Sequence, residues 1–160
     1  MKDINIVYVN YKMREDIMAA VASLAADILG CPYSVQITVV DNSNNIDGIK
    51  MALAEKFENV KYIDAGGNVG FGRGNTIGFK SAPARYYFAL NRDTIIFPNS
   101  NTIRRLVEFM DANPKIGCIG PKLVNMDGSL QETCYRFDFR SIIIKPLKQI
   151  QYDKKSRRAN

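Results

Sequence analysis

The feature that most constrains this 160-residue sequence is a regular alternation of short apolar runs with helical patterns. Short runs rich in β-branched side chains are typical of buried strands, and apolar residues at three- and four-residue steps are typical of amphipathic helices. Four strand–helix units predict an α/β fold, with a mostly parallel sheet that is flanked by helices. We expect strands at 4–9, 35–40, 60–63, 85–90 and 116–119, and helices at 14–29, 46–57, 102–110 and in a segment ending near 80.

The composition is that of an ordinary globular domain, with 46% hydrophobic and 24% charged residues. No apolar stretch approaches the ~20 residues needed to span a bilayer. The N-terminal residues 1–6 carry Lys2 and Asp3 before an apolar strand and contain no signal-peptide pattern. We therefore expect a cytoplasmic protein.

The sequence contains no histidine. This excludes Ser-His and Cys-His nucleophilic catalysis, and it leaves carboxylates as the expected metal ligands and acid–base groups. Cys31, Cys118 and Cys134 lie far apart and form no C-x-x-C pair. We expect reduced thiols in the core and neither a disulfide framework nor a zinc site.

Much of the net charge of +6 lies near the C-terminus. Such a tail is either a solvated terminus or a segment that contacts anionic lipid at the inner face of the membrane. No basic stripe interleaved with aromatic residues accompanies it, so we expect no nucleic-acid partner. The basic residues of the tail are Lys145, Lys148, Lys154, Lys155, Arg157 and Arg158.

Polar residues follow several of the expected strands directly. Asn10 follows the first strand, Asp41 the second, and Asn91 and Asp93 the fourth. In parallel α/β sheets, ligands bind beyond the carboxyl ends of the strands. We therefore expect a binding site at this edge of the sheet.

A glycine-dense loop, residues 66–75, precedes the third expected helix. It does not contain G-x-G-x-x-G, because the residue three positions after Gly72 is Asn75 and not glycine. It does not contain a Walker A motif either, because its later glycines have the wrong spacing. Its glycines permit close backbone approach beside a helix start, where amide groups favour an anion. The alternative is a tight connection without a ligand.

The residues after the second strand and the fourth strand each allow two interpretations. Asp93 with Asn91 suits a hard divalent cation that also binds a substrate diphosphate, but the same residues often form a turn. The run Asp41, Asn42 and Ser43 suits a nucleobase N–H or a ribose hydroxyl, but it also suits the N-cap of the following helix.

Taken in order along the chain, these motifs resemble those of family 2 glycosyltransferases with a GT-A fold, especially a rhamnosyltransferase-like branch. The resemblance runs from residue 4 to about residue 139. The matching motifs are Asn10-Tyr11, Val39-Val40-Asp41-Asn42-Ser43, Gly67-Asn68-Val69-Gly70-Phe71-Gly72 with Asn75, Leu90-Asn91-Arg92-Asp93, Gly120-Pro121-Lys122-Leu123 and Asp127-Gly128-Ser129.

The resemblance implies a nucleotide-sugar-binding domain over 1–139, followed by a basic tail or the start of a truncated acceptor region over 140–160. It implies that the site is built in two parts: a nucleotide pocket and a D-x-D-like metal motif, in which Asp93 is the ligand of Mg²⁺ or Mn²⁺. The nucleotide-binding residues that it implies are Asn10, Tyr11, Asp41, Asn42, Ser43, Asn68, Gly70, Phe71, Asn75 and Asn91.

The implied activity is metal-assisted, inverting transfer of a sugar from a UDP- or dTDP-linked donor to a saccharide or lipid-linked acceptor in surface-polysaccharide synthesis. Two departures from the family pattern stand out. Arg92 occupies a position that is commonly proline, and no later acidic motif supplies a catalytic base beyond Phe139. We therefore expect a truncated chain without its own base, and a non-catalytic or partner-dependent nucleotide-sugar-binding module is the alternative.

Overall fold

A computed structural model describes residues 1–125 and 127–131 of the chain. The chain divides into two units, residues 1–119 and residues 120–160. The larger unit contains every helix and strand described below. No helix among the described residues is both long enough and apolar enough to cross a membrane.

The larger unit is built on a sheet of four parallel strands in the order β3-β2-β1-β4. The strands are β1 (Lys2–Asn10), β2 (Val35–Asp41), β3 (Val60–Asp64) and β4 (Ala84–Ala89). A helix follows each strand, so every parallel connection crosses a face of the sheet, as parallel pairing requires. The sequence-based prediction of an α/β fold with a parallel sheet is confirmed.

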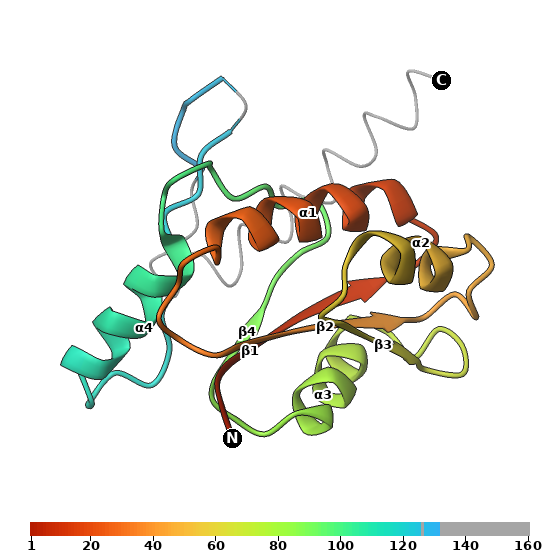
Figure 1. Ribbon diagram of the computed structural model, residues 1–160, viewed down its shortest axis with the longest axis horizontal. Helices are drawn as coiled ribbons and strands as arrows, with labels where there is room; N and C mark the ends of the chain where they lie inside the picture. Colours follow the sequence, from red (N-terminus) through yellow and green to blue (C-terminus); the bar gives the residue numbers. More distant parts are fainter. Residues whose placement is uncertain (126, 132–160) are drawn as a thin grey trace, which may run out of the picture. The chain divides into compact units, whose positions relative to one another are not determined.

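The register of the strands aligns their carboxyl ends. Asn10 of β1 lies opposite Asp41 of β2, and Asp41 lies opposite Asp64 of β3. The loops that follow these three strands gather at one end of the sheet, at the right in Figure 1. Three polar residues, widely separated in the sequence, are thereby placed in one row.

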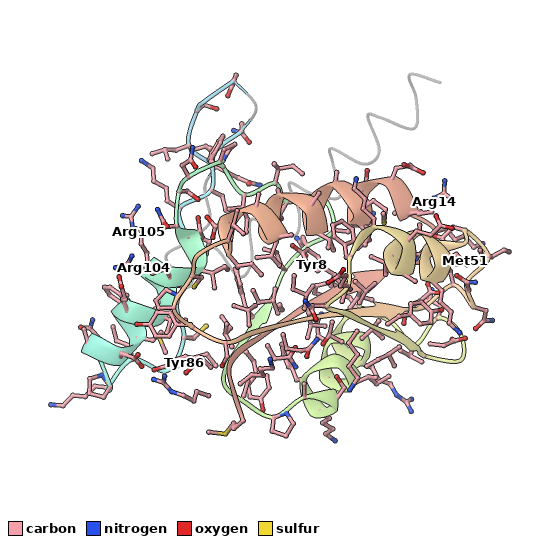
Figure 2. The ribbon with its side chains drawn as sticks, in the orientation of Figure 1. Tyr8, Arg14, Met51, Tyr86, Arg104 and Arg105 are labelled. Atoms are coloured by element: carbon pink, nitrogen blue, oxygen red, sulfur yellow. The ribbon has the colours of Figure 1, made fainter. Side chains whose placement is uncertain are left out.

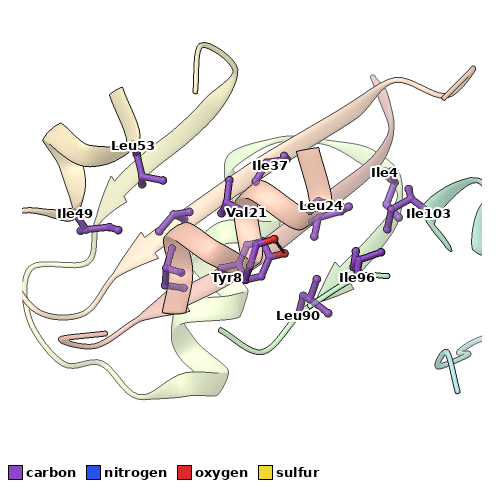
Figure 3. Packing of buried hydrophobic residues seen from close by; sticks show 14 of the residues in the cluster. Ile4, Tyr8, Val21, Leu24, Ile37, Ile49, Leu53, Leu90, Ile96 and Ile103 are labelled. Atoms are coloured by element: carbon purple, nitrogen blue, oxygen red, sulfur yellow. Dashed lines mark hydrogen bonds between the residues drawn. The ribbon is translucent and has the colours of Figure 1, made fainter. Parts of the chain in front are cut away.

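One face of the sheet packs against α1 (Arg14–Asp27), α2 (Ile49–Lys56) and α4 (Thr102–Ala112). Ile4, Ile6 and Tyr8 of β1 point into this core because side chains alternate along a strand (Figure 3). Each fully buried large apolar side chain of this kind contributes roughly 1.5–3 kcal/mol. The other buried members are Ile17, Ala20, Val21, Leu24, Ile37, Val39, Ile49, Leu53, Leu90, Ile96, Ile103 and Val107.

The opposite face of the sheet packs against α3 (Phe71–Ser81), which lies below the sheet in Figure 1. The contact is close because two glycines face the sheet. A Cβ on Gly78 would lie 2.8 Å from Val7 Cγ2 and 3.2 Å from Val40 Cγ2, and one on Gly74 would lie 3.0 Å from Val9 Cγ2. Glycine is therefore required at both positions for this helix to rest on the valines.

Asn5 fastens the C-terminal end of α3 to the sheet. This fully buried side chain donates from Nδ2 to the carbonyls of Gly78 and Ala82, both at 3.1 Å. Its Oδ1 accepts the Thr38 hydroxyl at 3.0 Å. The carbonyls at a helix C-terminus lack intrahelical partners, and Asn5 supplies a donor to two of the carbonyls at this end of α3.

Asp27, at the end of α1, caps the start of α4. Its Oδ1 accepts the Thr102 amide and the Ser100 hydroxyl, and its Oδ2 accepts the Ile103 amide, all at 3.0 Å. The residue that precedes α4, Asn101, makes no side-chain cap hydrogen bond. A carboxylate 75 residues earlier in the chain thus supplies the cap, and it also favours the positive end of the helix dipole.

The expectations for residues 116–119 and for the burial of the cysteines are wrong. Residues 116–119 form no strand, and the Ile116 side chain is exposed. The thiols of Cys31 and Cys118 are free, as expected, but Cys31 is only half-buried and Cys118 is exposed, so neither belongs to the core. Cys134 lies outside the described residues.

The smaller unit contains a hairpin around the Asp127-Gly128 pair. Val124 and Leu130 form an antiparallel bridge, and the Gln131 amide donates to Leu123 O at 3.0 Å. Gly128 has a φ of 82°, which glycine adopts without strain. The expected domain boundary at 139–140 and the basic tail lie outside the described residues.

Replacing Gly78 with alanine should destabilise the protein by about 1–3 kcal/mol, because the new methyl group overlaps the Val7 side chain. Chemical denaturation of the purified chain measures this loss. Gly72→Ala is the matched control in the same helix. A Cβ there meets no atom within 4 Å, so the control should raise stability by up to about 1 kcal/mol. Equal effects of the two substitutions would contradict the close packing.

Replacing Asp27 with alanine should cost about 2–3 kcal/mol of unfolding free energy, because it removes a helix cap and leaves buried donors unpaired. Glu15→Ala, on the exposed surface of the same helix, should cost less than about 1 kcal/mol. Thermal unfolding followed by circular dichroism compares the two variants. Similar transition temperatures would show that Asp27 does not cap α4.

Candidate functional site

The site forms where β1 and β2 end. Asn10 and Asp41 are both fully buried, and Asn10 Nδ2 donates to Asp41 Oδ1 at 2.9 Å. The same amide nitrogen donates to Asp47 Oδ2 at 2.9 Å, and Asn10 Oδ1 accepts the Met13 amide at 3.2 Å. Asn10 therefore joins the loop after β1 to the loop after β2.

The loop after β2 folds around the Asp41 carboxylate. Oδ1 accepts the Ser43 amide at 3.0 Å and the Ser43 hydroxyl at 2.5 Å. Oδ2 accepts the Asn45 amide at 2.6 Å and the Tyr62 hydroxyl of β3 at 3.0 Å. Asp41 has the local turn geometry common for aspartate, but it is anchored by two neighbouring strands as well.

The alternative role of residues 41–43, as the N-cap of the following helix, does not occur. α2 begins at Ile49, and its first amides are bonded by later residues. Asp47 Oδ1 accepts the Ile49 amide at 3.2 Å, and Asn45 Oδ1 accepts the Lys50 amide at 2.9 Å. The helix predicted to begin at residue 46 therefore begins three residues later.

The electrostatics of this cluster favour an ionised Asp41 and a neutral Tyr62. Burial raises the pKa of the Asp41 carboxyl, but hydrogen bonds from Ser43, Asn45 and Asn10 outweigh it, so the pKa lies below its usual value. Burial also raises the pKa of Tyr62, and the hydrogen bond to Asp41 raises it further. The tyrosine hydroxyl remains a donor to a charged acceptor.

The glycine-rich loop lies beside this cluster. Asn68 Oδ1 accepts the Gly70 amide at 3.0 Å, and Asn42 Nδ2 donates to the Gly70 carbonyl at 3.3 Å. Gly70 has a φ of 82° and precedes the first residue of α3, Phe71, whose side chain is exposed. No side chain caps this helix start, so its first amides remain available for a ligand.

Two buried acceptors beside the loop have no hydrogen-bond partner among the described residues. They are Asn42 Oδ1 and Asn75 Oδ1, on side chains that are 3% and 6% exposed. The Nδ2 groups of both residues are bonded, Asn42 to Gly70 O and Asn75 to Phe71 O at 3.0 Å. Buried polar atoms are usually paired, so these two oxygens mark a place where a donor is lacking.

A cavity of 430 Å³ opens beside the loop that follows β1. It is lined by Lys12, Met13, Arg14, Glu15, Asp16 and Asp47. Arg14, at the start of α1, lies near α2 (Figure 2), and its Nη1 donates to the Asp47 carbonyl at 3.3 Å. Tyr11 is 42% exposed, with the Lys12 ammonium 5.3 Å from its ring centre. The loop thus presents an aromatic face and cationic groups.

Asn91 and Asp93 follow β4, and both side chains are exposed. The Thr94 amide donates to Asn91 O at 3.2 Å, which closes the turn between them. Among the described residues, no group of three or more acidic, cysteine or histidine side chains is arranged to hold a metal. A single carboxylate with an amide nearby is nevertheless a donor set that suits Mg²⁺ or Mn²⁺, since such ions often take their remaining ligands from water and substrate phosphate.

The structure therefore links some of the predicted site residues and not others. Hydrogen bonds join Asn10, Asp41 and Ser43 into one set. In a second set, Asn42 and Asn68 both bond to Gly70, and Asn75 bonds to Phe71. No hydrogen bond among the described residues ties Tyr11, Asn91 or Asp93 to either set. The binding and metal roles of all these residues stay predictions.

The sequence analysis missed Asp47 and Tyr62. Asp47 precedes a glycine just before α2, a position typical of a residue that bonds to the first amides of a helix. Tyr62 carries no comparable signal, because its bond to Asp41 depends on the pairing of β2 with β3.

The family is evident from the sequence as a whole. Residues 4–157 match the model of Glycosyl transferase family 2. A curated relative, the low-salt glycan biosynthesis hexosyltransferase Agl10 of Haloferax volcanii, is 28% identical over 134 residues. That match covers 80% of this chain and 39% of the relative, so the chain spans about two-fifths of the length of Agl10.

Solved structures share the fold. TarS of S. aureus in complex with UDP has a TM-score of 0.56 and 20% identity, over 70% of this chain and 33% of TarS. The mannosyltransferase PcManGT of Pyrobaculum calidifontis, in complex with GDP-Man and Mn²⁺, has a TM-score of 0.60 and 14% identity, over 73% of this chain and 36% of that protein. The parallel sheet with helices on both faces is thus GT-A-like, and the chain belongs to glycosyl transferase family 2.

Proposed function

We propose that this chain forms the donor-binding part of a glycosyltransferase that takes a sugar from a nucleoside diphosphate. The donor is UDP- or dTDP-linked, and the acceptor is a saccharide or a lipid-linked saccharide in surface-polysaccharide synthesis. Membership of glycosyl transferase family 2 supports the reaction class. UDP, UDP-GlcNAc and GDP-Man in the related structures support a nucleotide-sugar donor.

The observation that carries the proposal is the row of polar groups at the carboxyl edge of the sheet. Asn10 and Asp41 lie side by side there, and Asn42 connects their loop to Gly70 at the start of α3. The unpaired oxygens of Asn42 and Asn75 lie beside the same loop and lack the kind of donor that a ribose or a nucleobase carries. An uncapped helix start and an exposed aromatic ring complete a surface suited to a nucleotide.

The chemistry is a substitution at the anomeric carbon of the donor. An acceptor hydroxyl forms the new C–O bond from the side opposite the diphosphate, which inverts the configuration. The old C–O bond breaks, and the nucleoside diphosphate leaves with the bonding electrons. The proton of the hydroxyl passes to a general base.

Asp93 and Asn91 would hold a divalent cation at the edge of this site. Such an ion supplies positive charge to the departing diphosphate when it is bound. The exposed Asp93 carboxylate takes part in no ion pair with the rest of the described chain, so it is available to a ligand. The Mn²⁺ in the related mannosyltransferase supports this assignment.

Calorimetric titration of the full chain with UDP, dTDP and GDP, with and without Mn²⁺, tests the proposal. We expect metal-dependent binding of UDP or dTDP in preference to GDP. Asp93→Ala should weaken nucleotide binding in the presence of Mn²⁺ by tenfold or more, because the metal loses its protein carboxylate. Mn²⁺ should then no longer raise the affinity.

The matched control is Glu55→Ala, which removes an exposed carboxylate on α2. It should bind nucleotide and metal as the unaltered chain does. Unchanged affinity of Asp93→Ala in both conditions would rule out the metal assignment. If the unaltered chain bound none of the three nucleotides, the proposed function would be wrong.

A further inference from the structure

The carboxylate of Asp41 has no capacity left for a ligand. A carboxylate offers about four lone-pair positions, and this one accepts five donors. They are the Ser43 amide and hydroxyl, the Asn45 amide, Asn10 Nδ2 and the Tyr62 hydroxyl, at 2.5–3.0 Å. The side chain is also fully buried. A ribose hydroxyl or a base N–H would have to displace one of these donors to reach it.

What Asp41 does is connect segments that are distant in the sequence. Its donors come from the end of β1, from β3 and from the loop that follows β2. The same loop carries Asn42, which reaches the Gly70 carbonyl in the glycine-rich loop. Asp41 is therefore connected through its loop and Asn42 to the start of α3, where the exposed Phe71 and the uncapped amides lie.

Tyr62 is the one donor to Asp41 that comes from β3. Its hydroxyl donates to Asp41 Oδ2, and its ring lies 5.8 Å from the Lys50 ammonium of α2. Because the phenol remains protonated beside an ionised carboxylate, this hydrogen bond is charge-assisted and stronger than a neutral one. Tyr62 therefore limits the movement of Asp41 from the side opposite to Asn10.

We propose that Asp41 and Tyr62 are positioning residues of the nucleotide site, which order the loop 42–47 and the turn at Gly70 without touching the nucleotide. This inference rests on the proposed function. A loop that is in the binding conformation for only a fraction of the time weakens apparent affinity by that fraction. Loosening the loop should therefore weaken every nucleotide alike, whereas a lost base contact would weaken one base more than another.

Tyr62→Phe tests this inference, because it removes one hydroxyl and keeps the ring. We expect the affinities for UDP, dTDP and GDP each to fall about three- to tenfold, with their ratios unchanged. Asp41→Asn should produce the same pattern with a larger loss. Tyr86→Phe is the matched control, since Tyr86 of β4 is also half-buried and its hydroxyl also bonds to an aspartate, Asp111, at 2.6 Å, away from the loop. It should leave all three affinities unchanged.

Amide hydrogen exchange supplies a second readout that a general loss of stability would not produce. The amides of Ser43 and Asn45 should lose protection in Tyr62→Phe, and saturating UDP should restore it. Protection elsewhere in the sheet should stay as in the unaltered chain.

Two results would overturn the inference. One is a Tyr62→Phe variant with the nucleotide affinities of the Tyr86→Phe control. The other is an Asp41→Asn variant whose preference among the three bases changes, which would indicate direct contact. Failure of the inference and failure of the proposed function give different results. If the unaltered chain binds no nucleotide, the proposed function is wrong; if it binds nucleotide but the variants behave as above, only this inference is wrong.

Discussion

The buried charge of Asp41 is the constraint on which the carboxyl edge of the sheet depends. Removing a carboxylate from water costs several kcal/mol unless hydrogen bonds replace its hydration. Here Asn10, Ser43, Asn45 and Tyr62 supply the replacement, so a loop and two strands must close around one side chain. Since these bonds lower the pKa of Asp41, their stabilising effect is present above the unfolded value near 3.8 and is lost as the pH falls through the folded value.

The position of α3 follows from packing on one side and hydrogen bonds at both ends. Its glycine face rests on valines of the sheet, Asn5 bonds to its last carbonyls, and Asn42 bonds to the residue just before its first turn. The glycine-rich loop therefore begins at a fixed strand and ends at a fixed helix.

Local patterns in the sequence predict most of the fold. The β-branched runs of β1 and β2 and the apolar spacing of α1 are strong signals, and their alternation predicts the parallel sheet. The run at 116–119 contains two isoleucines but forms no strand, because strand formation needs a pairing partner as well as propensity. The same limit applies to the site. The polar ends of the strands are visible in the sequence, but the bond between Tyr62 and Asp41 arises from register, which composition does not encode.

The cap that Asp27 provides has a consequence for the order of folding. An isolated helix of the length of α4 is marginal in water, and this one lacks a cap from its own flanking residue. Its order therefore depends on α1, which is synthesised some 75 residues earlier and can be folded before α4 emerges from the ribosome. The segment that carries Asp93 lies between β4 and α4, so it becomes tethered at both ends only when that late docking step is complete.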